Sequence, residues 1–186
     1  LSSVMVGWIG TVPLAAHQVM LTISQLGYML YYGMAAAVAI RVSYYHGQKN
    51  YANADNTASA GLQLILLMGV AISIPIFLFR HVIGGLFTNS NEVVGMVSLT
   101  IIPFIIYQFG DGMQSNYANA LRGLSNVKPL MFVAFVAYFV ITLPLGYFFG
   151  ICLGGGLVGI WSAFPFGLTV AGVLYRLYFQ KTLCKE

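Results

Sequence analysis

The sequence carries very little charge. Only 8 of its 186 residues are Lys or Arg and 4 are Asp or Glu, which together make up 6% of the chain. Soluble domains carry about 25% charged residues, so this shortage excludes an ordinary soluble domain. Cysteine is also scarce, and the only two, Cys152 and Cys184, do not form a metal-binding spacing. We interpret the net charge of +4 as a membrane-topology signal and expect no nucleic-acid partner.

The motifs of common enzymes are missing as well. The sequence contains no Walker phosphate loop, no HExxH or CxxC motif and no Ser/His/Asp order. We therefore expect a protein that is not an enzyme and that needs no cofactor. No basic region precedes the first apolar run, so no signal peptide is predicted, and we interpret Leu1 as a cut end.

Apolar residues, in contrast, are abundant and form long continuous runs. They make up 59% of the chain. A transmembrane helix needs about 20 such residues, whereas the strands of a membrane β-barrel alternate over about ten. The sequence therefore predicts an all-α polytopic membrane protein. We expect a truncated helix and five complete spans, at residues 1–10, 14–45, 57–79, 93–120, 129–149 and 156–179.

The polar stretch 41–57 is the least apolar part of the chain. We expect it to form a loop that overlaps the end of the first complete span. Asn53, Asp55 or Asn56 is predicted to cap the next helix, because short polar side chains accept hydrogen bonds from the first free N–H groups.

The basic residues predict the orientation. With five complete spans, one side of the membrane carries Arg80 alone. The other side carries Arg41, Lys49, Arg122, Lys128, Arg176, Lys181 and Lys185. Because Lys and Arg accumulate on the cytoplasmic side, we expect this second side, with the C-terminus, to face the cytoplasm. The predicted location is the inner (plasma) membrane of the cell, crossed several times.

One acid, Asp111, lies deep inside a predicted span. A carboxylate at that depth costs about 2.5–3.5 kcal/mol on insertion scales, and such residues usually carry ions or protons. Tyr107 is one helical turn before it and Ser115 one turn after, so all three share a face. Oxygen donors of this kind suit a proton or a hard cation such as Na⁺. We predict a cation site at Asp111 and Tyr107; the alternative is a structural acid bonded to a neighbouring helix.

The first complete span carries a polar stripe. Gln18, Thr22 and Gln25 are spaced i, i+4, i+7 and share one face. Such a stripe either lines a cavity or forms hydrogen bonds between helices, and both interpretations stay open. His17, near the outer end of this span, is interpreted as an interfacial histidine, with a proton relay as the alternative.

Six short motifs together resemble one known family. They are LAAHQV (14–19), AVAIRV (37–42), HGQKN (46–50), YQFGD (107–111), LRG (121–123) and LPLGYFFG (143–150). Their order and gaps resemble the multidrug and toxic compound extrusion (MATE) transporters, in particular the NorM-type branch. The resemblance covers essentially the whole chain. It implies the C-terminal six-helix lobe of a twelve-helix transporter, with the N-terminal six-helix lobe as the missing partner.

This resemblance also implies a function. The family exports organic cations in exchange for Na⁺ or H⁺, with Asp111 and Tyr107 in the pattern that couples the cation. Gln18, Thr22 and Tyr28 would face the central substrate cavity, to which we add Gln25 and Ser115. Two alternatives stay open. One is a lipid-linked oligosaccharide flippase of the same superfamily, although the spans lack deep basic residues for an anionic substrate. The other is a non-transporting remnant or assembly partner in which Asp111 only packs.

Overall fold

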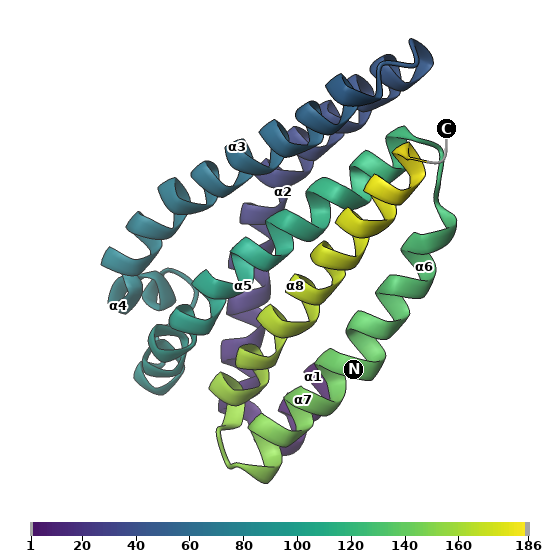
Figure 1. Cartoon of the computed structure of the whole chain (residues 1–186). Coiled ribbons are helices and arrows are strands. Elements are labelled where there is room, and N and C mark those ends of the chain that lie inside the picture. Colours follow the sequence, from purple (N-terminus) through teal and green to yellow (C-terminus); the bar gives the residue numbers. More distant parts are fainter. Residues whose placement is uncertain (1, 185–186) are drawn as a thin grey trace.

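The computed structural model describes residues 2–184, and its regular structure is helical throughout (Figure 1). The elements are α1 (Ser2–Ile9), α2 (Thr11–Gly47), α3 (Tyr51–Leu78), α4 (Arg80–Ile83), η1 (Gly84–Leu86), α5 (Asn91–Gly123), α6 (Lys128–Phe135), η2 (Val136–Thr142), α7 (Leu143–Tyr147), η3 (Phe148–Cys152) and α8 (Gly156–Leu183). Within the described residues, five helical stretches are long and apolar enough to cross a membrane: α2, α3, α5, the run Lys128–Cys152, and α8. The predicted all-α membrane fold with five complete spans is confirmed.

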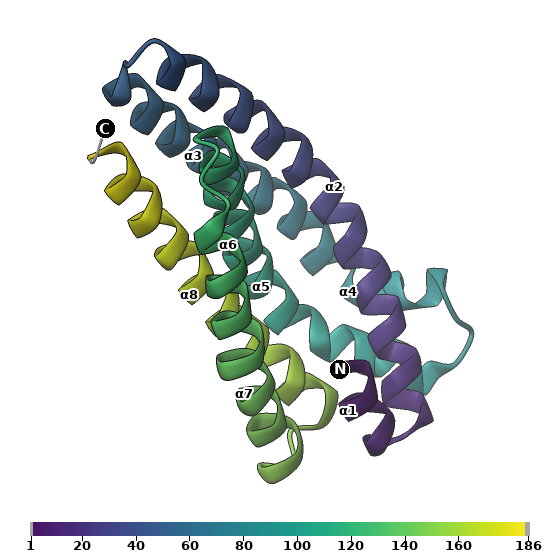
Figure 2. The ribbon, with the colours of Figure 1, turned by 90° about the vertical axis from the view of Figure 1, so that its right-hand side faces the viewer.

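Helix α5 is the centre of the bundle. It packs against α8 on one side and against α2 and α3 on the other, and the run α6–η3 covers α8 (Figures 1 and 2). Because neighbours surround it, α5 buries a larger share of its apolar residues than α2 or α3 does. Large exposed side chains such as Met131, Phe132 and Leu67 lie on the outer helices, where the bilayer would cover them. The middle of α5 is therefore shielded by neighbouring helices.

The polar stretch 41–57 is mostly helical, so the prediction of a loop there is wrong. Helix α2 continues to Gly47 and α3 already begins at Tyr51, which leaves a three-residue turn in which Lys49 adopts a φ of 56°. Polar residues do not end these helices, because a helix satisfies its own backbone hydrogen bonds whether it lies in lipid or extends beyond it.

The cap of α3 also differs from the prediction. Asn50 is the N-cap, and its side-chain oxygen accepts a hydrogen bond from the backbone N–H of Asn53 at 3.2 Å. The predicted caps, Asn53, Asp55 and Asn56, lie inside the helix. The N-cap precedes the predicted ones because α3 begins six residues before the start of the predicted span. Hydropathy indicates where the membrane begins, and the helix begins before that point.

The fourth span is one continuous helical run with two π-helical stretches, Val136–Thr142 and Phe148–Cys152. The first contains a side-chain bond in which the Thr142 hydroxyl donates to the carbonyl of Ala137 at 2.7 Å. The second precedes the glycine turn into α8. π-Turns are rare and concentrate at functional sites, and the apolar pattern of the sequence contained no sign of them.

The two ends of the bundle differ in charge. The turn between α2 and α3, the turn between α5 and α6 and the C-terminal end of α8 lie together at one end, which we call the basic end (Figure 1). The described basic residues at or within about two turns of it are Arg41, Lys49, Arg122, Lys128, Arg176 and Lys181, whereas Arg80 lies at the opposite end. Lys185 lies outside the described residues. The structure thus groups the basic residues as predicted, and the side that faces the cytoplasm stays a prediction.

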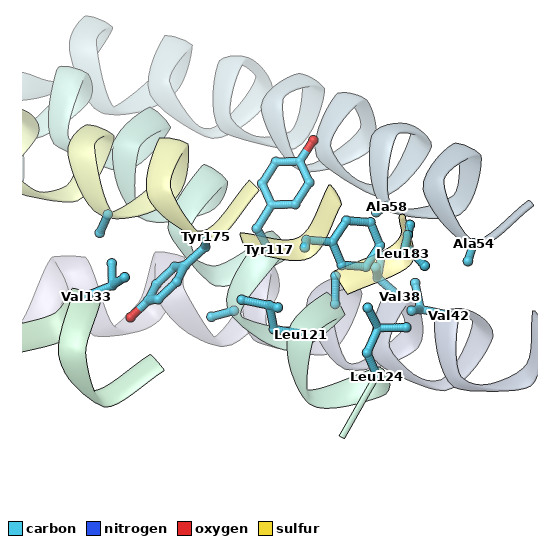
Figure 3. Packing of buried hydrophobic residues seen from close by; sticks show 14 of the residues in the cluster. Val38, Val42, Ala54, Ala58, Tyr117, Leu121, Leu124, Val133, Tyr175 and Leu183 are labelled. Atoms are coloured by element: carbon cyan, nitrogen blue, oxygen red, sulfur yellow. The ribbon is translucent and has the colours of Figure 1, made fainter. Parts of the chain in front are cut away.

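Two apolar cores fill the two ends. The core at the basic end joins α2, α3, α5, α6 and α8 through residues such as Val38, Leu121, Val133 and Phe179 (Figure 3). The core at the other end joins α1, α2, α5 and α8 through residues such as Met20, Ile101, Phe104 and Trp161. The segment of α5 between its contributions to the two cores, residues 107–115, carries the polar groups of the candidate site.

Candidate functional site

Asp111 lies on α5 between the two apolar cores and is only 7% exposed. Within residues 2–184, no Lys or Arg forms an ion pair with it and no side chain forms a hydrogen bond with it. A structural acid would need such a partner, because a buried charge without one is costly. The carboxylate is therefore held in the bundle with its oxygen atoms free of protein hydrogen bonds from the described part of the chain.

Four tyrosines lie within electrostatic range of this carboxylate. Tyr28 and Tyr31 come from α2, Tyr107 from α5 and Tyr138 from η2, and each interacts electrostatically with Asp111. We call these five residues the Asp111 cluster. Each phenol has one oxygen that either donates or accepts a hydrogen bond. The cluster thus combines phenol oxygen atoms from three elements with a single negative charge.

Tyr107 is held in place by other aromatic rings. Trp161 of α8 and Phe164 meet its ring edge-on, with centroids 5.6 and 6.1 Å away. Phe104, one turn earlier on α5, stacks against it at 5.9 Å. Tyr107 also interacts with Ser24 of α2. Since rings in such contacts have little freedom to turn, the phenol oxygen keeps its direction in the cluster.

Trp161 is in turn fixed by His17. The indole N–H of Trp161 donates to Nδ1 of His17 at 3.1 Å, and Nε2 of the same ring lies 3.3 Å from the Ser3 hydroxyl. Because an indole only donates, Nδ1 carries no proton, and a neutral His17 donates from Nε2. His17 is fully buried. Helices α1 and α8 therefore enclose His17 within the bundle, and its depth in the membrane stays a prediction.

We expect Trp161→Phe to destabilise the protein. The substitution keeps most of the ring but leaves Nδ1 of His17 buried without a donor, which costs roughly 1–3 kcal/mol. Trp8→Phe is the matched control, because Trp8 is the other tryptophan and is 70% exposed. Thermal unfolding in detergent should give a lower midpoint temperature for Trp161→Phe than for the unmodified protein. The midpoint temperature of Trp8→Phe should be unchanged. Equal midpoints for the two variants would contradict a stabilising role of this bond.

Gln108 connects the cluster to α3. Its Oε1 accepts hydrogen bonds from the hydroxyls of Tyr31 at 3.1 Å and Ser73 at 3.2 Å, so one amide joins α2, α3 and α5. Its Nε2 is buried without a partner among the described residues. The bond to Tyr31 orients one phenol of the Asp111 cluster. Neither Tyr31 nor Ser73 stands out in the sequence by its spacing or by a motif.

The predicted cavity residues lie in two places. Gln18, Thr22, Gln25 and Tyr28 are all exposed on α2, and the Thr22 hydroxyl donates to the carbonyl of Gln18 in the same helix at 3.0 Å. Of these four, Tyr28 interacts with Asp111. Ser115 is buried one turn beyond Asp111, where its carbonyl accepts a bond from the Asn119 amide. Of the predicted residues, Tyr107 and Tyr28 thus interact electrostatically with Asp111, and the stripe of α2 is open on the surface of the bundle.

Five helical stretches long and apolar enough to cross a membrane, with a buried carboxylate on the central one, define a polytopic membrane protein. A family model described as MatE matches residues 1–148. The chain therefore belongs to the MatE family, and the predicted resemblance is confirmed.

Known relatives agree with this assignment. The "Probable multidrug resistance protein NorM" of Xanthomonas campestris pv. campestris is 34% identical over 182 residues, which are 97% of this chain and 40% of that protein. A crystal structure of MATE in the straight conformation has a TM-score of 0.89 at 18% identity, covering 99% of this chain and 41% of that one. The inward-facing conformation of a multidrug resistance MATE family transporter has a TM-score of 0.84 at 18% identity, over 93% and 40%. The chain thus spans about 40% of these proteins, and the structures show a shared fold.

Proposed function

We propose that the full-length protein is an antiporter that exports organic cations in exchange for Na⁺ or H⁺. In this proposal the basic end faces the cytoplasm and Asp111 carries the coupling ion. The observation that supports it is the Asp111 cluster: one buried carboxylate, four phenol oxygens and no basic partner among the described residues. The family membership supports an efflux transporter in general.

The chemistry of the cluster suits ion exchange. A carboxylate in apolar surroundings is stable only when a positive charge neutralises it, and a proton or Na⁺ is small enough to do so between helices. Phenol oxygens complete the ligands that a hard cation requires. A cationic substrate would compete for the same negative charge, so binding of one releases the other. Movement of two lobes around a midplane site then gives access to each side in turn.

Ethidium efflux from vesicles tests this function. The full-length protein is reconstituted, and efflux is recorded first with an imposed Na⁺ gradient and then with an imposed pH gradient. We expect efflux under one of the two gradients, and that gradient identifies the coupling ion. The flippase alternative predicts no efflux under either gradient but movement of a lipid-linked anionic sugar. A remnant or assembly partner predicts neither activity.

A further inference from the structure

A second site lies away from the Asp111 cluster, between α2 and α3. It is a groove of about 370 Å³ that begins near the basic end and runs along the two helices. No residue of the Asp111 cluster lines it. Small residues, Ala37, Ala60 and Gly61, form part of its wall and leave the space open between longer neighbours.

The groove changes from polar to apolar along its length. Its polar residues lie toward the turn between the helices and are Arg41, Tyr45, Asn53, Asn56 and Thr57. Met34 and Leu64 lie at the other end of the groove. Since a helix rises 1.5 Å per residue, Leu64 lies about 20 Å from the start of α3. This gradient follows the depth of a bilayer leaflet, from the headgroups to the acyl chains.

The charge of the groove selects its ligand. Arg41 is the only charged residue in the lining, and within residues 2–184 it forms no ion pair. An organic cation would be repelled, because no acid lines the groove. A small free anion would use Arg41 but not the apolar half. A molecule with an anionic head and an apolar tail matches both halves.

We propose that this groove binds an anionic phospholipid of the leaflet at the basic end. The Arg41 guanidinium holds the phosphate, since its fork of N–H donors matches phosphate oxygens. The Asn56 amide lines the same polar end of the groove and supplies N–H donors for the ester oxygens. The Thr57 hydroxyl already donates to the carbonyl of Asn53 at 2.7 Å. An acyl chain lies along Met34 and Leu64. The site does not depend on the coupling function proposed for Asp111.

Native mass spectrometry of the full-length protein in detergent tests this site. The probes are phosphatidylglycerol and phosphatidylcholine with identical palmitoyl and oleoyl chains. We expect one phosphatidylglycerol to bind more tightly than phosphatidylcholine. Arg41→Gln should weaken phosphatidylglycerol binding about fivefold, which is the usual contribution of one basic residue near anionic lipid. It should weaken phosphatidylcholine binding less, because the choline ammonium offsets the charge of the phosphate that Arg41 holds. Ala60→Leu, which fills the groove, should weaken binding of both lipids.

Two matched variants separate the groove from general surface effects. Lys49→Gln removes a neighbouring charge that does not line the groove, and Ala71→Leu enlarges an exposed residue of α3 outside it. Both should bind the two lipids as the unmodified protein does. The proposal is overturned if Lys49→Gln and Arg41→Gln weaken binding equally, or if neither does. It is also overturned if glycerol 3-phosphate displaces phosphatidylglycerol when both are present at similar concentrations. The groove would then bind the anionic group alone, and its apolar half would not contribute to binding.

Discussion

Asp111→Asn is expected to reduce gradient-driven ethidium efflux to the rate of vesicles without protein. Asparagine has nearly the same shape as aspartate but has no charge, so it neither releases a proton nor attracts Na⁺. The described residues offer no other carboxylate near the cluster, since Asp55 and Glu92 lie toward the two ends of the bundle. The variant should still insert into the membrane, because a neutral amide is less costly at that depth than a carboxylate. The measurement is efflux under the Na⁺ or pH gradient that drives the unmodified protein.

Asp55→Asn is the matched control for this experiment. It removes one acid of the same type from α3, outside the Asp111 cluster, and should leave the efflux rate unchanged. Equal amounts of folded protein in the vesicles exclude a loss of insertion. Normal efflux in Asp111→Asn would contradict the coupling role of this carboxylate. Equal loss in both acid variants would point to a general effect of charge on the vesicles.

The spans and the central acid could be predicted from local chemistry. A continuous apolar run identifies a membrane helix by itself, and α5 extends only a few residues beyond the predicted 93–120. Asp111 stands out because a charge in such a run has a cost that its neighbours in the sequence do not offset. Tyr107 follows from helical spacing alone. These predictions needed no knowledge of which helices touch.

Other features depend on contacts between distant segments. Tyr138 joins Asp111 from η2, and no spacing within its own span points to α5. His17 is buried because Trp161, 144 residues later, supplies its hydrogen-bond donor. The helical part of 41–57 cannot be predicted for another reason, since hydropathy measures transfer into lipid and helices continue past the lipid boundary. The central acid of the candidate site can therefore be predicted from the sequence, whereas part of its surroundings cannot.

Gly123 in the LRG motif shows how closely α5 and α2 approach each other. A Cβ atom at this position would stand 2.5 Å from the carbonyl oxygen of Ala39, a backbone atom of α2. On either side of this contact, Leu121 and Leu124 join Val38 in the core at the basic end (Figure 3). Small residues at helix crossings let backbones come this close. Glycine is therefore required at this crossing for spatial reasons, since its φ is not among the positive values.

We expect Gly123→Ala to lower the thermal stability of the full-length protein by roughly 1–3 kcal/mol, the usual cost of overpacking, because a backbone atom cannot rotate away as a side chain does. Gly95→Ala is the control on the same helix: Gly95 is exposed, and a Cβ there meets nothing within 4 Å. That variant should be neutral or more stable by up to about 1 kcal/mol, because alanine favours the helix. The two variants are compared by their midpoint temperatures of thermal unfolding in detergent, with size-exclusion chromatography as the readout of folded protein. If Gly123→Ala were as stable as Gly95→Ala, α2 and α5 would have to be further apart at the basic end than the structure places them.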